Sequence, residues 1–89
     1  MNFYDITASY KEDGQYIRGV PVIVTITDGG GYIVGDESVK SSNSATFKTR
    51  PAGVDRYAVF VSYFPLTSGK KTLTFTANDV TKTETFTVK

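Results

Sequence analysis

The strongest constraint on the fold is a period-two alternation of side chains through residues 57–77. In Thr72–Ala77, three threonines alternate with leucine, phenylalanine and alanine. This pattern is typical of a β-strand with one buried and one exposed face. The segment Tyr57–Phe64 is apolar on both faces, which predicts a central strand or a strand whose second face is covered. Pro65 and Gly69, between the two segments, predict a turn.

The rest of the chain consists of similar short segments separated by residues typical of turns. We expect further strands over residues 2–10, 20–27, 32–34, 44–50 and 82–89. A polar loop is expected over residues 38–43, and a turn at Asp13-Gly14. About seven strands, spaced roughly 8–12 residues apart, predict an all-β sandwich. At this length we expect a single domain covering residues 1–89.

The composition argues against several classes of function. The chain has no histidine and no cysteine, so the commonest general base, the commonest metal ligands and the thiol nucleophile are missing. We therefore expect a protein that is not an enzyme, with no catalytic residue, no cofactor and no bound metal. The net charge is +1 and the basic residues are scattered, which argues against nucleic-acid binding. No apolar run is long enough to predict direct insertion into a membrane.

One segment, residues 11–26, shows a family-like pattern. Asp13-Gly14 forms a turn signal, Ile17 takes an apolar position, and Gly19-Val20 leads into a strand. This pattern resembles bacterial Ig-like domains of group 1, the repeated modules of invasin- and intimin-type adhesins. Later segments are similar to the remaining strands and turns of that family: 56–64, 67–69, 72–77 and 83–88. The resemblance implies an immunoglobulin-like β-sandwich of about seven strands, and it specifies a fold rather than an activity.

The resemblance also implies a setting for the chain. It is expected to be a structural or adhesion-type interaction module of a larger bacterial surface protein, outside the cell. Such a module acts as a spacer, contacts neighbouring modules of the same chain, and in some cases binds a cell-surface receptor or a glycan. Two alternatives stay open. One is an Ig-like module of a phage virion protein, in a capsid decoration, tail or fibre that binds the bacterial surface. The other is an accessory module of a secreted polysaccharide-degrading enzyme.

Aromatic residues are the candidates for an interaction face: Phe60, Phe64, Tyr16 and Tyr32. If alternate residues of Tyr57–Phe64 face the core, Phe60 and Phe64 lie outside and are available to a partner. A bulge near Ser62 or Pro65 would instead bury both faces in part, and a neighbouring strand or loop could also cover them. The two tyrosines lie beside predicted turns, where a ring can stack on a sugar, contact a protein or cap the core.

The acidic residues suggest one further hypothesis. Three of them follow or precede glycine-rich turns: Asp28, Asp36 and Glu37. Oxygen-rich loops of this kind bind Ca²⁺, but the spacing is not that of an EF-hand, so solvated carboxylates are the expected state. Asp55 is expected to pair with Arg50 or Arg56, the two arginines that bracket its turn.

Overall fold

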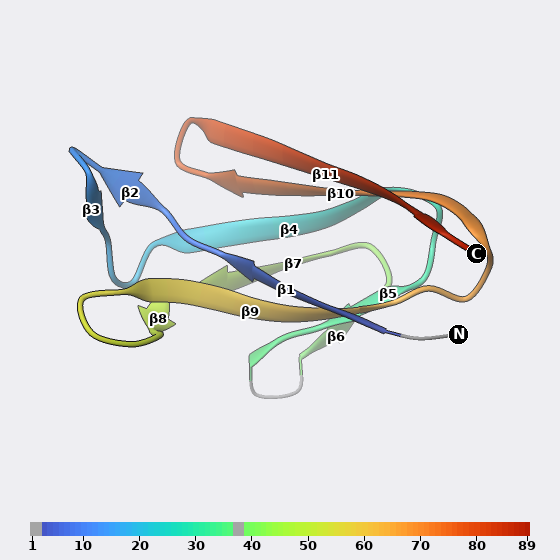
Figure 1. The fold of residues 1–89 in the computed structure, drawn as a ribbon, viewed down its shortest axis with the longest axis horizontal. Coiled ribbons are helices and arrows are strands. Elements are labelled where there is room, and N and C mark those ends of the chain that lie inside the picture. Colours follow the sequence, from blue (N-terminus) through green and yellow to red (C-terminus); the bar gives the residue numbers. More distant parts are fainter. Residues whose placement is uncertain (1–2, 37–38) are drawn as a thin grey trace.

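The structure is a computed structural model that describes residues 3–36 and 39–89. Two antiparallel sheets pack face to face (Figure 1). The first contains β1 (Tyr4–Ala8), β9 (Tyr57–Phe64), β5 (Tyr32–Val34) and β6 (Lys40–Ser41) in this order, and β8 (Arg50–Pro51) also pairs with β9. The second contains β11 (Val80–Val88), β10 (Gly69–Ala77), β4 (Pro21–Asp28) and β7 (Ser44–Lys48). A separate hairpin pairs β2 (Lys11–Glu12) with β3 (Gln15–Tyr16).

The predicted all-β class is confirmed, and the two packed sheets form a β-sandwich. Within the described residues, seven strands have three or more residues and four strands have two. The loop expected over residues 38–43 is wrong in part, because Lys40 and Ser41 pair with β5. Residues 37 and 38 lie outside the described part of the chain.

The last two strands are longer than the sequence predicts. β10 begins two residues earlier than the expected start at Lys71, at Gly69, and β11 begins two residues earlier, at Val80. Asn78, at a φ of 53°, reverses the chain between Ala77 and Val80. Asparagine tolerates this left-handed conformation in a tight hairpin turn, so the two strands pair over their whole length.

β9 lies inside the first sheet, and its two faces have different surroundings. Its inward side chains are buried in the core: Val59, Val61 and Tyr63. The pairing of β9 with β1 continues over five residue pairs without a register shift. Strict alternation therefore places Phe60 and Phe64 on the outer face. The predicted alternative of a bulge near Ser62 is wrong, because a bulge would have interrupted this register.

The first and last strands meet at the same end of the molecule. The sandwich measures 38 × 24 × 19 Å, and the start of β1 and the end of β11 lie at one end of its longest axis (Figure 1). The rings of Tyr4 and Phe86, near those two points, are 4.9 Å apart between centroids. The β2–β3 hairpin lies at the opposite end (Figure 1).

Lys71 of β10 is buried, with 1% of its surface exposed. Alternation places it on the same face as Leu73, a core residue. Its Nζ donates hydrogen bonds to the Gly29 carbonyl (2.8 Å), the Thr67 hydroxyl (2.7 Å) and the Ser68 carbonyl (3.4 Å). These acceptors match the three donors of an ammonium group, and all of them are neutral. The lysine is therefore buried with hydrogen-bond partners rather than with an opposite charge.

Tyr63 of β9 makes a second buried hydrogen bond to the same stretch of backbone. It is fully buried, and its hydroxyl donates a hydrogen bond to the Gly30 carbonyl. Residues 29–31, which we call the glycine crossing, connect β4 in one sheet to β5 in the other. Buried side chains from both sheets therefore bind consecutive carbonyls of the crossing. Desolvation by burial raises the pKa of the Tyr63 hydroxyl.

Replacing Lys71 with methionine should lower the free energy of unfolding by about 1–3 kcal/mol, because the Gly29 carbonyl loses its buried donor. Its exposed neighbour Lys70 provides the matched control, and Lys70→Met should change the stability by less than about 0.5 kcal/mol. Urea titrations followed by circular dichroism measure both variants. Equal stabilities would show that the buried ammonium does not stabilise the fold.

Tyr63 should make stability fall at alkaline pH. The raised pKa means that the unfolded chain loses this proton first, near pH 10, while the folded chain still retains it. The Tyr63 hydroxyl makes its full contribution to the free energy of unfolding below about pH 10. This contribution is lost as the pH rises through the folded-state pKa. The difference in unfolding free energy between wild type and Tyr63→Phe should therefore shrink above pH 10. A constant difference up to pH 11 would contradict this assignment.

Candidate functional site

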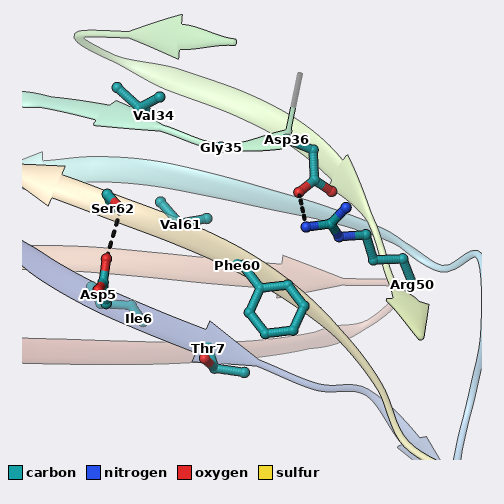
Figure 2. Close-up of a pocket in the computed structure, with 10 residues that line it drawn as sticks. All are labelled: Asp5, Ile6, Thr7, Val34, Gly35, Asp36, Arg50, Phe60, Val61 and Ser62. Carbon is teal, nitrogen blue, oxygen red and sulfur yellow. Dashed lines mark hydrogen bonds and ion pairs between the residues drawn. The ribbon is translucent and has the colours of Figure 1, made fainter. Parts of the chain in front are cut away.

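An open groove of about 670 Å³ lies on the outer face of the first sheet (Figure 2). We call it the outer groove. Strands β1, β9 and β8 and the end of β5 form it, and its lining residues are Asp5, Ile6, Thr7, Val34, Gly35, Asp36, Arg50, Phe60, Val61 and Ser62. The groove is a surface feature of a sheet whose other face builds the core, so rigid strands position its side chains.

The register of β1 and β9 sets the polar part of the groove. Asp5 lies opposite Ser62, and Thr7 lies opposite Phe60. The Ser62 hydroxyl donates a hydrogen bond of 2.7 Å to Asp5 Oδ1 (Figure 2). A carboxylate accepts several hydrogen bonds, so Asp5 keeps acceptor capacity toward the open side of the groove.

Arg50 forms the other wall of the groove. Its guanidinium centre lies 5.3 Å from the centroid of the Phe60 ring, within cation–π range. Its Nη2 is 3.1 Å from Asp36 Oδ1 (Figure 2). The Arg50 side chain is 55% exposed, so this ion pair stays in contact with water. Arg50 thus covers part of the Phe60 ring and offers free N–H donors to a ligand.

The expected ion pair of Asp55 is not present among the described residues. Arg50 pairs with Asp36 instead, and the guanidinium of Arg56 lies 5.6 Å from the ring centroid of Tyr16. Asp55 itself takes a φ of 55°, in the left-handed region that aspartate tolerates in turns. The prediction was wrong because it considered only neighbours in sequence, whereas sheet pairing brings β8 beside the end of β5.

Beside the outer groove, the same sheet face has three aromatic side chains in a row. We call Phe3, Phe64 and Tyr32 the aromatic row. The rings of Tyr32 and Phe64 stack at 4.9 Å with an interplanar angle of 12°, and those of Phe3 and Phe64 stack at 5.3 Å. Lys40 Nζ lies 4.2 Å from the Tyr32 centroid. The row is partly exposed, and Phe3 retains 54% of its surface in contact with water.

The structure brings together three of the four predicted interaction residues. Phe60, Phe64 and Tyr32 lie on one face of the first sheet, because β5 and β9 are neighbours there. Tyr16 belongs to the β2–β3 hairpin at the far end and contacts Lys11 and Arg56 through its ring. Sequence reasoning did not include the polar groove residues in the site. The sequence did contain evidence for Asp5, because alternation places it on the polar face of the first predicted strand.

The acidic candidates do not come together as a metal site. Asp36 pairs with Arg50, and Asp28 ends β4 opposite Thr72 in the register. Glu37 lies outside the described residues. In the described ranges, no three side chains of aspartate, glutamate, histidine or cysteine are grouped to hold an ion. The described carboxylates therefore give no support to Ca²⁺ binding.

The outer groove and the aromatic row combine polar and aromatic groups. The outer groove offers guanidinium and hydroxyl donors, carboxylate acceptors and the Phe60 ring within one surface. The neighbouring aromatic row adds further ring area. A few fixed polar groups beside aromatic surface are typical of small-ligand sites.

In comparisons with known proteins, no family model, no curated protein and no solved structure matches this chain. In the part of the chain that the structure describes, no helix is long and apolar enough to cross a membrane.

Replacing Arg50 with methionine should leave the protein folded. Removing an exposed ion pair costs less than about 1 kcal/mol, so the melting temperature should fall by no more than about 4–8 °C. Val24→Ala, in the core, is the comparison and should destabilise more because it leaves a cavity. Thermal melts measure both. A loss for Arg50→Met as large as that for Val24→Ala would show that Arg50 is a structural residue.

Proposed function

We propose that this chain is a non-enzymatic interaction module that binds a glycan through the outer groove and the aromatic row. The observation that supports this most directly is the position of Phe60, Phe64 and Tyr32 on one exposed sheet face, beside hydrogen-bonding groups. The absence of histidine and cysteine from the sequence is consistent with a binding role.

A polyhydroxylated ligand fits the mixed character of this face. Sugar rings combine an apolar C–H surface, which packs on aromatic rings, with hydroxyls that both donate and accept hydrogen bonds. Asp5 provides an acceptor, and Arg50 and Thr7 provide donors around Phe60. A purely apolar partner would leave these polar groups without hydrogen bonds, which is unfavourable.

We also propose that the fold is related to immunoglobulin domains. In those domains the B and E strands pair in one sheet, and the C and F strands pair in the other. Here β4 pairs with β7, and β5 pairs with β9, in the same chain order. The other neighbours differ, since β1 lies beside β9 and β10 lies beside β4. The pairing of these four strands supports the relationship, and the different neighbours of β1 and β10 distinguish this chain from the standard arrangement.

The first and last strands meet at one end of the sandwich, which supports a domain that presents a binding face rather than one that adds length between two neighbouring domains. A domain adds length to a string of modules when the chain enters at one end of its long axis and leaves at the other. Here Tyr4 and Phe86 are in contact at a single end. Segments joined to both ends would leave from the same place, and the sandwich would project from them.

A bacterial surface protein is our preferred setting, with a receptor or glycan as partner. A projecting module is equally suited to a phage virion that contacts bacterial polysaccharide. An accessory module of a secreted polysaccharide-degrading enzyme would bind the polysaccharide that its enzyme degrades. The sequence of the parent protein distinguishes the three, through anchor and repeat modules, virion assembly segments or a catalytic domain.

The test is binding of the labelled protein to whole bacteria, purified bacterial surface polysaccharides, cellulose and chitin. Phe60→Ala should weaken binding at least tenfold, because the ring lies within the outer groove. Ile23→Ala is the matched control, since Ile23 is also exposed but lies on the outer face of the second sheet. Thermal melts must show that both variants are folded. Absence of binding to every probe, or equal binding by both variants, would contradict the proposal.

A further inference from the structure

The edge strand β11 is long and regular, and its two charged side chains, Lys82 and Glu84, share the face of the core residues Phe75 and Leu73, where unpaired charges discourage pairing with another strand. β11 runs over nine residues from Val80 to Val88, and among the described strands it pairs only with β10. Its register with β10 continues from Gly69↔Val88 to Ala77↔Val80 without a bulge. It contains no proline and no glycine. A long, regular edge strand of this kind is a ready template for pairing with another strand.

The backbone groups available for pairing follow from the turn. Ala77 and Val80 flank a two-residue turn, and residues in that position exchange hydrogen bonds with each other. Hydrogen bonding then alternates along the strand. The N–H and C=O groups of alternate residues, all of them threonines, therefore point away from β10 toward the open edge: Thr81, Thr83, Thr85 and Thr87.

The side chains of β11 are complementary to a second copy of themselves. Lys82 and Glu84 are 78% and 50% exposed, and their charged atoms are 4.0 Å apart within one chain. If two β11 strands pair antiparallel about a two-fold axis at Thr83, Lys82 of each lies opposite Glu84 of the other. Val80, which is 56% exposed, then lies opposite Phe86 of the second copy. Cross-strand pairs of opposite charge stabilise a sheet.

Neighbouring registers lack this complementarity. A two-fold axis at Lys82 would place the two lysines opposite each other, and an axis at Glu84 would place the two glutamates opposite each other. Like charges directly opposite are destabilising. In a register displaced by one residue, each core-facing residue of one β11 strand would lie opposite an outward-facing residue of the other. The inner faces of the two sheets would then not match.

We propose that a second copy of this chain pairs with β11 in antiparallel orientation, centred on Thr83, to form a symmetric dimer. The two four-stranded sheets then become one continuous sheet. In this dimer, β11 of one molecule contacts β11 of the other, as two-fold symmetry requires. This inference is independent of the proposed glycan binding, since the outer groove lies on the other sheet.

The test is a charge exchange measured by analytical ultracentrifugation over a wide range of concentrations. The wild type should dimerise as its concentration rises. Lys82→Glu alone and Glu84→Lys alone should each weaken dimerisation at least tenfold, because each variant places like charges opposite each other. A mixture of the two variants should form a heterodimer, since every charged pair is then complementary again. The double variant Lys82→Glu/Glu84→Lys should dimerise like the wild type.

Lys48→Glu is the matched control. It changes the net charge as Lys82→Glu does, but it lies at the end of β7, on the opposite edge of the same sheet. It should leave dimerisation unchanged, and thermal melts confirm that every variant is folded. The proposal is overturned if the wild type stays monomeric at all concentrations. It is also overturned if it dimerises and the charge variants dimerise equally well, because another surface would then be responsible.

Discussion

The glycine crossing and the two buried side chains that bind it determine how the two sheets are joined. A Cβ atom on Gly29 would lie 2.5 Å from the Lys71 Cδ atom, and one on Gly31 would lie 2.6 Å from the Phe64 carbonyl oxygen. The backbone can pass this closely only with glycine, and both residues have φ values in the left-handed region, 97° and 89°. Tyr32 follows directly and stacks on Phe64, so the crossing also positions the aromatic row.

Strand β9 contributes side chains to both the core and the candidate site. The inward side chains of β9 belong to the core, and its outward side chains, Phe60, Ser62 and Phe64, belong to the groove and the aromatic row. The apolar rings on the outer face are not left fully exposed. Arg50 covers part of Phe60, and Phe3 and Tyr32 stack on Phe64. These contacts hold the rings in fixed orientations. Less side-chain conformational entropy would therefore be lost if a ligand bound to them.

The sequence allowed prediction of the features that depend on local periodicity. The boundaries of β9 follow from its apolar run, and alternation places Phe60 and Phe64 on the same face, because successive strand residues point to opposite faces. Which of the two apolar faces is buried could not be predicted from that pattern. Contacts between distant segments could not be predicted in this way, and the Arg50–Asp36 pair depends on which strands become neighbours. Lys71 shows what was overlooked. Alternation places it on the same face as Leu73, but lysine is almost never fully buried, so its place in the core was not predicted.

The meeting of both chain ends at one end of the sandwich has a mechanical consequence. A tensile load applied between the two ends would pull β1 and β11 away from their neighbours starting at Tyr4 and Val88. The inter-strand hydrogen bonds lie perpendicular to the strands, so they would break one after another rather than all together. Such peeling needs far less force than shearing two strands along their length. Under a load applied at these two points, the sandwich would therefore offer little mechanical resistance.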